Sequence, residues 1–413
     1  MTTLATRAAR LLPAPGASRA LAYATLASST GRGLFVTASV IYFHHVAGLS
    51  AVEVGTGMTL AAVVSLSAGI PMGRLADRFG ARGMTVCFAA VAAVGTLAYL
   101  QVRTWWTFVL VASVVAFLQA AQQAARGALI AGSVPPGERV RTRAYLRAVT
   151  NVGWMVGAPL AGLALYHDTV TGYAALIAAA AAMQMSGALL TLRVPRPVPV
   201  PVTDGPRRWT ALRDRPYVAL AALNAVLNIH YGVLNIAIPL WVVERTEAPA
   251  WTVAVLAGVN TVFVILLQVR ASRSSATVTG AATAQRRAGL LLLVACALYA
   301  LAAEGSPVTA TIVLALGALV HVLGELLQAA GAWGLSFELA PAHAQGEYQG
   351  LYNTGFQIAD IIAPALLTSV VIGWGLPGWL LFGVAFAVAG VAVPAAAGWA
   401  ARTRPVPVPA TAA

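Results

Sequence analysis

The chain has 413 residues, of which 59% are hydrophobic and only 9% are charged. A soluble domain carries about 25% charged residues, so this composition excludes a water-soluble fold. The net charge of +13 comes from arginine without any lysine, which we interpret as the codon bias of a GC-rich bacterial genome. In so apolar a chain this charge indicates basic loops that orient membrane helices, not nucleic-acid binding. The two cysteines, Cys87 and Cys296, lie inside apolar runs and exclude a disulfide framework.

Apolar runs recur along the whole chain, and each is close to the roughly 20 residues that a helix needs to cross a bilayer. The first run is too long for the hydrophobic region of a signal peptide, so we expect a retained helix there. Lipid offers no partners for backbone N–H and C=O groups, and runs of this length exceed barrel strands. The expected fold class is therefore an all-α membrane protein with twelve transmembrane helices, at residues 20–43, 54–72, 84–101, 105–132, 148–166, 171–192, 217–243, 251–269, 288–303, 308–337, 350–372 and 378–400.

Arginine positions predict the topology of these helices. If the amino terminus lies in the cytoplasm, only Arg103 and Arg245 fall in outside loops, and only Arg32 and Arg126 fall within helices. The other 22 of the 26 arginines then lie on the cytoplasmic side, which is the asymmetry expected of membrane proteins. We therefore expect a multi-pass protein of the plasma membrane with both termini in the cytoplasm.

A Pro-rich, basic segment at 193–216 divides the chain. We expect it to be a cytoplasmic linker between one six-helix bundle at 1–192 and a second at 217–413. The halves are similar in sequence, because the segment from Pro136 through Pro159 resembles the segment from Pro341 through Pro364 at the same spacing. Two parallel repeats of six helices are typical of one architecture of secondary transporters.

The sequence GRLADRFGAR, between the second and third expected helices, has the pattern G-x-x-x-D-R-x-G-x-R. In this pattern the chain resembles the major facilitator superfamily, which places such a loop on the cytoplasmic side. The resemblance implies that Gly73, Asp77, Arg78, Gly80 and Arg82 form a loop that switches with conformation. A turn permitted by glycine would hold the aspartate and the cations beside a neighbouring helix end.

Two shorter segments also resemble that superfamily. Arg126 is similar to the arginine of its fourth helix, and GWMVGAPLAG is similar to the Gly/Pro signature in the fifth helix of drug/proton antiporters. The matching residues are Gly153, Gly157, Pro159 and Gly162, whereas Ala158 and Leu163 depart from the signature. The alternative interpretation is that these small residues only let helices pack closely.

Polar residues recur at offsets of three, four and seven inside the first, fourth, seventh and tenth helices, so each set lies on one helix face. In the superfamily that the chain resembles, these four helices surround the central cavity, and a residue of the eleventh helix would extend its wall. The alternative for any one of these residues is an interhelical hydrogen bond. The expected substrate cavity consists of Arg32, Gln119, Gln123, Arg126, Asn224, Asn228, Tyr231, Asn235, His321, Gln328 and Gln357.

Two carboxyl groups, Glu325 and Asp360, lie inside expected helices. Charges in hydrocarbon are costly, so both are candidates for function, and we expect them to carry protons because a buried carboxyl can change protonation near neutral pH. His230 lies off the polar face of its helix and is interpreted as a packing residue. No metal site is expected, since no third ligand is spaced to join His321 and Glu325.

The sequence contains no nucleotide-binding loop, nucleophile elbow or zinc motif, so we expect neither enzyme activity nor ATP-driven transport, and no cofactor. It favours a proton-coupled secondary transporter that exports amphipathic small molecules, such as antibiotics, works as a monomer and alternates access between its halves. The first alternative is an importer of a small organic anion, which Arg32 and Arg126 would attract. A second alternative is a membrane-embedded enzyme or receptor, for which the sequence has neither catalytic motifs nor a sizeable extramembrane domain.

Overall fold

The computed structural model describes residues 15–165, 169–197 and 210–404, and within these ranges every regular element is a helix. The first half contains α2 (Ala17–His45), α3 (Ala51–Leu66), α4 (Gly69–Phe79), α5 (Ala81–Ala98), η1 (Tyr99–Gln101), α6 (Trp105–Ser133), α7 (Pro136–Leu165) and α8 (Val170–Thr191). The second half contains η2 (Ala211–Arg213), α9 (Arg215–Asn228), α10 (His230–Gly232), η3 (Val233–Ala237), α11 (Ile238–Arg245), α12 (Trp251–Ala271), η4 (Ser272–Ala276), α13 (Val278–Leu301), η5 (Ala302–Glu304), α14 (Pro307–Glu338), η6 (Ala342–Ala344), α15 (Gln345–Leu366), η7 (Leu367–Ile372) and α16 (Leu376–Arg402).

Twelve helical segments of the described residues are long enough to cross a bilayer. Nine of them are also apolar enough to do so, and the pair α3 and α4, bent by 47° at its break, makes a tenth. The helices α2 and α7 complete the set, although α7 begins with the strongly basic sequence PGERVRTRAYLR. The prediction of an all-α membrane protein is confirmed.

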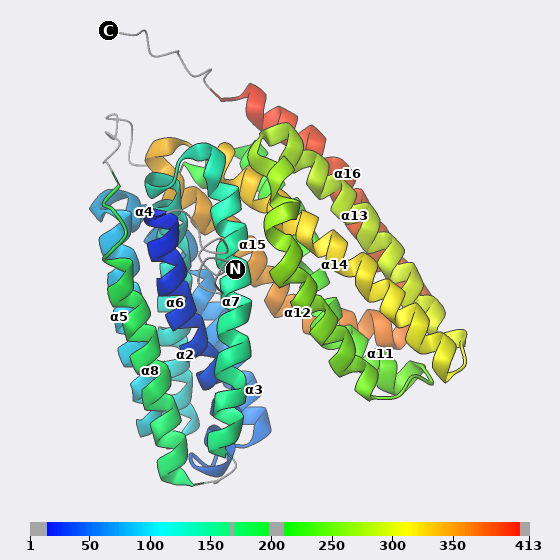
Figure 1. Cartoon of the computed structure of the whole chain (residues 1–413), viewed down its shortest axis with the longest axis horizontal. Coiled ribbons are helices and arrows are strands. Elements are labelled where there is room, and N and C mark those ends of the chain that lie inside the picture. The colour runs from blue at the N-terminus through cyan, green and yellow to red at the C-terminus, as the bar shows by residue number, and fades with distance from the viewer. Residues whose placement is uncertain (1–14, 166–168, 198–209, 405–413) are drawn as a thin grey trace, which may run out of the picture.

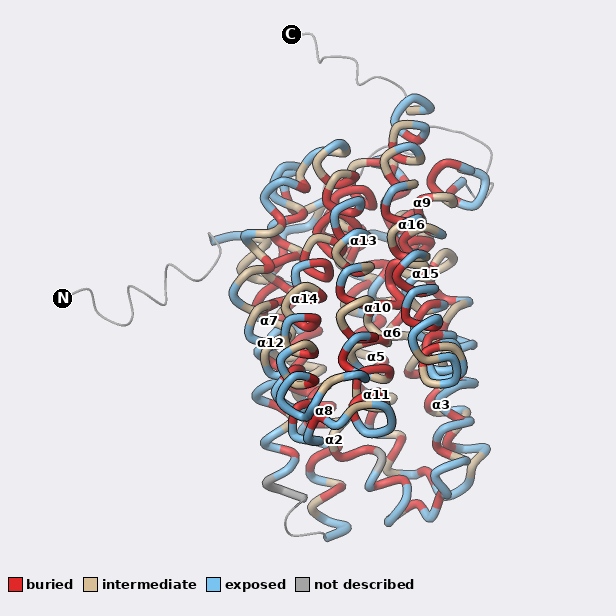
Figure 2. Tube along the Cα trace, turned by 90° about the vertical axis from the view of Figure 1, so that its right-hand side faces the viewer, coloured by how far each residue is buried: buried red, intermediate tan, exposed pale blue. Residues whose placement is uncertain are grey.

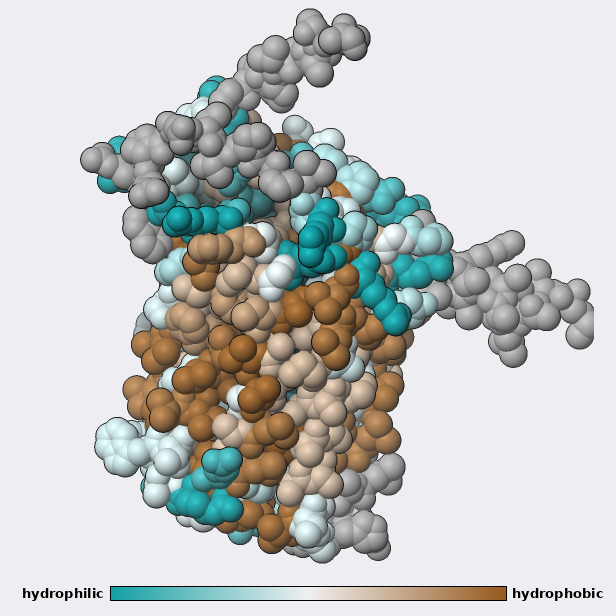
Figure 3. Space-filling model, turned by 90° about the vertical axis from the view of Figure 1, so that its left-hand side faces the viewer, coloured by the Kyte–Doolittle hydropathy of each residue, from teal (hydrophilic) through white to brown (hydrophobic). Residues whose placement is uncertain are grey.

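The outer faces of the helices are apolar. Figure 3 shows a broad apolar band on one face of the molecule, between polar residues at its two ends. Exposed aliphatic side chains such as Val91, Leu110 and Val384 belong to α5, α6 and α16, and Figure 2 shows exposed residues along the outward sides of the helices and buried residues between them. Such a surface suits the hydrocarbon of a bilayer.

The helices pack in two groups, α2–α8 and α9–α16, which lie side by side (Figure 1). In the first group α2 packs on α7 and α8, and in the second α13 packs on α14 and α16. Small residues permit these contacts. A Cβ added to Gly31 of α2 would lie 2.6 Å from the carbonyl oxygen of Ala180, and one added to Gly331 of α14 would lie 2.6 Å from that of Ala281.

The two groups contact each other mainly at one end of the molecule. We call it the arginine-rich end, because Arg82, Arg139 and Arg402 lie in the helix turns nearest to it and Arg193 lies just after α8 there. There α4 packs on α15, and α7 packs on α12, η4 and α14. Towards the opposite end, where α3 and α11 lie, the two groups diverge (Figure 1).

The segment GRLADRFGAR is more helical than the sequence predicted. Helix α4 continues to Phe79, so Gly73, Asp77 and Arg78 lie in its last turns and not in a loop. The whole turn to α5 is made by Gly80, whose φ is +98°. Glycine adopts this left-handed backbone without the steric cost that a side chain would add, so a single residue suffices for the turn.

Three other predicted helices also differ from the structure. Helix α7 begins at Pro136 and not at 148, and α13 begins at Val278 and not at 288, because arginine is a good helix former and a basic stretch does not end a helix. The seventh predicted helix, 217–243, is interrupted: α9 ends at Asn228, and the π-helix η3 follows the short turn α10. Such an interruption changes the direction in which the following side chains point.

Candidate functional site

An ion pair joins the two helix groups in the interior. Arg147 of α7 donates from Nη2 to Oε1 of Glu325 on α14. The side chains are 18% and 5% exposed, so both charges are largely withdrawn from water. Asn260 of α12 donates to the second carboxylate oxygen at 2.7 Å, and the Arg147 guanidinium lies 5.3 Å from the ring centre of Tyr231. A buried pair of this kind is stable only while both partners remain together.

A network of amides lies inside the second group. Gln328 donates from Nε2 to the side-chain oxygens of Asn224 and Asn228, at 2.9 Å in each case, and Gln285 of α13 donates to Asn224 at 3.2 Å. All four side chains are buried. The predicted cavity residues Asn224, Asn228 and Gln328 therefore find their hydrogen-bond partners in one another and in Gln285. These are interhelical hydrogen bonds between α9, α13 and α14. Contact of Asn224, Asn228 or Gln328 with a substrate remains a prediction.

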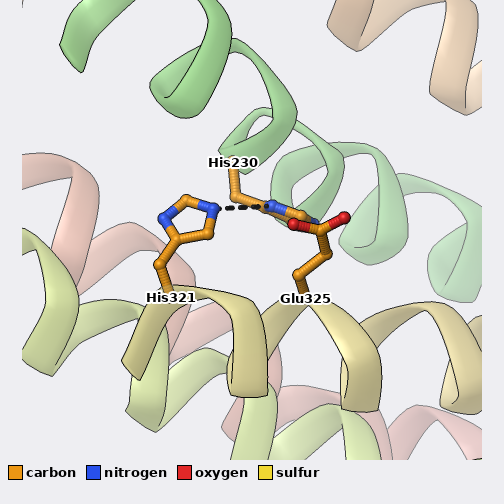
Figure 4. Close-up of side chains that lie close together, drawn as sticks. All are labelled: His230, His321 and Glu325. Carbon is orange, nitrogen blue, oxygen red and sulfur yellow. Dashed lines mark hydrogen bonds between the residues drawn. The ribbon is translucent and has the colours of Figure 1, made fainter. Parts of the chain in front are cut away.

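His230 completes a cluster with His321 and Glu325, which the sequence analysis did not expect. Figure 4 shows the His230 imidazole extending from α10 to meet two side chains of α14, and its Nδ1 lies 3.2 Å from Nε2 of His321. One ligand atom from each of the three residues lies within 4.8 Å of the others. The prediction that no third ligand joins His321 and Glu325 was therefore wrong. It assumed a regular helix through 217–243, whereas the break after Asn228 turns His230 towards α14.

Three arginines of the first group, Arg32, Arg126 and Arg143, have no acidic partner among the described residues. Arg126 of α6 donates to the hydroxyl of Thr25 on α2, and Arg143 of α7 donates to Gln349 of α15 at 3.5 Å. Arg32 is partly buried, and its charge and that of Arg143 both act on Arg126. None of the three arginines forms an ion pair with a described residue. They are a cluster of cations that an anionic group could neutralise.

The remaining predicted cavity residues are more accessible. On α6, Gln119 is partly buried and Gln123 is exposed. On the seventh helix, Tyr231 is partly buried, and the exposed Asn235 only bonds back to the Tyr231 carbonyl at 2.8 Å. That contact lies within one helix and does not tie Asn235 to a neighbouring helix.

Helix α15 carries two predicted residues on the side that faces α3. Gln357 donates to the hydroxyl of Ser65 on α3 at 3.2 Å, which is a further polar contact between the two groups. Asp360 lies three residues further along, on the same side of α15, and is exposed. Among the described residues it has neither a hydrogen-bond partner nor an ion-pair partner, so this carboxyl is free to bind a proton or a ligand.

The closest approach between the groups involves glycines on α4 and α15. A Cβ added to Gly73 would lie 2.5 Å from the carbonyl carbon of Gly346 and closer still to its oxygen. One turn earlier, a Cβ on Gly69 would lie 2.8 Å from the carbonyl oxygen of Gly350. Only glycine on both helices allows the backbones to touch in this way.

Asp77 binds the first turn of α15 from the other group. Its two carboxylate oxygens accept from the backbone N–H groups of Gly346, at 2.7 Å, and Glu347, at 2.9 Å. These N–H groups have no partner inside their own helix, and a helix amino terminus favours negative charge. The sequence analysis expected this aspartate to engage a neighbouring helix end, and the structure places it against α15.

Comparison with known proteins identifies the family. The family model described as Major Facilitator Superfamily matches residues 21–364. The chain belongs to this superfamily. No curated protein matches the sequence.

Solved structures of transporters share the fold. A bacterial homologue of the iron transporter ferroportin, in its outward-facing state, has a TM-score of 0.74 and 14% identity over 93% of this chain and 99% of that one. The same homologue with soaked iron gives a TM-score of 0.72 at 14% identity, over 94% of this chain and 99% of that one. The human organic anion transporter TETRAN has a TM-score of 0.67 and 13% identity, over 91% and 98% of the two chains. At these identities the likeness is one of fold.

The basic residues of the superfamily motif contact neighbours on their own side. Arg82 donates from Nη1 to the carbonyl oxygens of Leu192, at 3.2 Å, and Val194, at 3.1 Å, which fixes the end of α8. The Arg78 guanidinium lies over the ring of Phe79 at 5.4 Å. Thus Asp77 reaches across to the second group, whereas Arg82 holds the first group together.

The glycines of the fifth-helix segment pack against α2. A Cβ on Gly153 would lie 2.9 Å from Cβ of Ser29, and one on Gly157 would lie 2.9 Å from the backbone nitrogen of Leu34. Gly162 has nothing within 4 Å of its Cβ position, and Pro159 lies inside α7. Close packing, the alternative given by the sequence, accounts for Gly153 and Gly157.

Two functional candidates, Arg143 and Arg147, were missed by the sequence analysis. It counted both as residues of a cytoplasmic loop before the fifth helix, but both lie inside α7 and point between the groups. Their spacing of four residues puts them on one helix face, which is the signal that could have identified them.

Proposed function

We propose that the chain is a secondary active transporter that exports amphipathic small molecules, such as antibiotics or other drug-like metabolites, in exchange for protons. Membership of the superfamily supports the transport class, and the resemblance of Gly153–Gly162 to the drug/proton antiporter signature supports the direction. The two helix groups, 1–192 and 217–413 with the linker 193–216 between them, would rock so that a central path opens to each side in turn. No catalytic step is part of this proposal.

The observation that carries the proposal is the ion pair between Arg147 and Glu325. Each charge belongs to a different helix group, and both are largely buried. Opening the arginine-rich end separates them, and each then needs water or another partner, because an unpaired buried charge is strongly destabilising. The pair, the Gly73–Gly346 contact and the Asp77 hydrogen bonds therefore favour the closed arrangement of that end.

The proton carrier in this proposal is Asp360. The sequence analysis named both Asp360 and Glu325, but Glu325 is already bound by Arg147 and Asn260, whereas Asp360 is exposed and has no partner among the described residues. A free, exposed carboxylate on the side of α15 that faces α3 can take up a proton. In this proposal Glu325 stabilises the contact that closes the arginine-rich end and does not carry the proton.

The orientation in this proposal follows the arginine distribution. The arginine-rich end would face the cytoplasm of a bacterium, with both termini and the linker on that side. One chain in the plasma membrane would suffice for transport. The closed contact of α4 with α15 then blocks the cytoplasmic side.

The test is transport in proteoliposomes with an imposed pH gradient, using compounds selected from a drug-like library by thermal shift. We expect Asp360→Asn to abolish gradient-driven accumulation and to retain counterflow exchange without a gradient. Glu304→Gln, which removes an exposed carboxylate of η5, is the matched control and should behave like the parent. Gradient-driven transport by Asp360→Asn at the parent's rate would exclude Asp360 as the carrier.

A second candidate function is the import of a small organic anion. Arg32, Arg126 and Arg143 favour it, because their charges have no acidic partner among the described residues. In this case, small carboxylates should compete with the transported compound, and Arg126→Gln should abolish the competition. Competition that survives this substitution would remove the arginine cluster from substrate binding.

A further inference from the structure

The cluster of His230, His321 and Glu325 has a composition that the proposed exchange of protons does not explain. Three residues that commonly bind metals meet in the interior of the second group, and all three are buried (Figure 4). They come from α10 and α14, two elements that are distant in sequence. Hydrogen bonding inside a helix bundle needs no such combination of two imidazoles and a carboxylate.

The distances between the donors suit a small metal ion. Two ligands that each lie about 2.1 Å from a metal, at a tetrahedral angle, are about 3.4 Å apart. Nδ1 of His230 and Nε2 of His321 are 3.2 Å apart, and one ligand atom from each of the three residues lies within 4.8 Å of the others. Contraction of this cluster by about 1–2 Å would bring three such atoms within bonding distance of one ion.

One ring nitrogen in the cluster has no hydrogen-bond partner. Nε2 of His230 is buried and bonds to no described residue, and the whole side chain is 0% exposed. Buried polar atoms are nearly always satisfied, so the orphaned Nε2 indicates a change of partner during function, in which the His230 ring offers this nitrogen to an ion. In the same cluster, Asn260 holds the Glu325 carboxylate, as expected of the residues that orient a metal ligand.

Whether a metal ion can occupy this site depends on the position of Arg147. Its guanidinium occupies one Glu325 oxygen in the present arrangement, and its charge would repel a divalent cation next to it. The two cations therefore exclude each other on the same carboxylate. Since Arg147 belongs to the other helix group, separation of the groups would remove it from Glu325 and leave the donor set free.

We propose that His230, His321 and Glu325 form a binding site for a divalent transition-metal ion of the Zn²⁺ or Co²⁺ type, which competes with Arg147 for Glu325. Two imidazoles and one carboxylate are a donor set of intermediate softness that suits these ions better than Ca²⁺ or Mg²⁺. A bound ion holds the arrangement in which Arg147 is withdrawn. The site is independent of the proposed proton exchange at Asp360. The test of metal binding and the test of proton-coupled transport can therefore fail independently of each other.

The test is a titration of the purified full-length protein with Co²⁺, after removal of any polyhistidine tag and treatment with a chelator. Co²⁺ in a low-coordinate nitrogen and oxygen site absorbs visible light, and Zn²⁺ should displace it and abolish the absorption. We expect one Co²⁺ per chain. Substitution of His230 or His321 by Ala should reduce the affinity by more than the about 10- to 100-fold that follows loss of an outer-shell partner.

Arg147→Gln gives the sharper result, because it predicts a gain. Removing the competing cation should raise the affinity for Co²⁺ about tenfold or more, because a unit positive charge beside a divalent ion repels it by at least that factor, and misfolding could not produce a gain. Arg141→Gln, which removes an exposed arginine of the same helix, and His343→Ala, which removes an exposed histidine, are the matched controls and should leave the affinity unchanged.

Three results would overturn the proposal. The first is the absence of stoichiometric Co²⁺ binding in both the parent and Arg147→Gln. The second is binding that survives in both histidine variants, which would mark it as adventitious. The third is an Arg147→Gln affinity equal to that of the parent, which would exclude competition for Glu325.

Discussion

Substitution of Gly73 by Ala tests whether the contact of α4 with α15 holds the arginine-rich end closed. The new Cβ would lie 2.5 Å from the carbonyl carbon of Gly346. Relief of this overlap requires the two backbones to separate by about 1 Å, since carbon atoms make contact at about 3.5–4.0 Å. The Asp77 hydrogen bonds to Gly346 and Glu347, now 2.7 and 2.9 Å long, would then exceed hydrogen-bonding distance.

The loss can be expressed as a change in population. Each hydrogen bond to a charged group contributes about 1.5–3 kcal/mol, so loss of both disfavours the closed arrangement by at least about 3 kcal/mol. Since 1.4 kcal/mol is tenfold in an equilibrium constant, the ratio of closed to open molecules should fall by about a hundredfold. Such a change would convert a protein that is mostly closed at this end into one that is mostly open.

The measurement is the distance between spin labels at Arg193 and Arg402, two exposed positions at the arginine-rich end of different groups, in a Cys87→Ala background. The distance distribution of Gly73→Ala should move to longer values. Gly83→Ala is the control, because its Cβ would meet nothing within 4 Å and alanine is a better helix former than glycine. An unchanged distribution in Gly73→Ala would refute the closing role of the glycine contact.

Two further predictions concern stability in the folded groups. Gln328→Leu should leave the buried oxygen of Asn228 without a donor and destabilise the protein by about 1–3 kcal/mol, measured as a lower midpoint of thermal unfolding in detergent; an unchanged midpoint would mean that water replaces the donor. Gly157→Ala should lower the same midpoint, because its Cβ would lie 2.9 Å from the Leu34 nitrogen, whereas Gly162→Ala has open space and should not; equal midpoints would exclude close packing of α7 on α2.

The membrane helices were predictable because their signal is physical and strong. A run of about 20 apolar residues has few other stable environments than a bilayer, and the predicted and observed spans agree closely for α6, α8 and α14. The prediction failed where a helix extends beyond the hydrocarbon. Arginines suit both a loop and a helix turn outside the bilayer, so the basic sequence before residue 148 could not show that α7 had already begun.

The candidate site was harder to predict, because it depends on contacts between distant segments. The offsets of three and four placed His321, Glu325 and Gln328 correctly on one face of α14. The same rule misplaced His230, because α9 ends at Asn228 and the regular angle of 100° per residue does not continue through that break into α10. The span as a whole still qualifies as a membrane helix, so its mean hydropathy does not reveal the break.

The partner of Glu325 could nevertheless have been found from depth alone. Arg147 lies eleven residues after the start of α7 at Pro136, or about 16 Å from the arginine-rich end at 1.5 Å per residue. Glu325 lies thirteen residues before the end of α14 at Glu338, or about 20 Å from the same end. Opposite charges at nearly equal depth, on helices that both belong to the interior of the molecule, reduce each other's cost of burial only if they meet. The topology count considers each arginine by itself, and the helix periodicity considers each helix by itself. A search for opposite charges at nearly equal depth compares residues on different helices. Here it identifies the Arg147–Glu325 ion pair, on which both proposals depend.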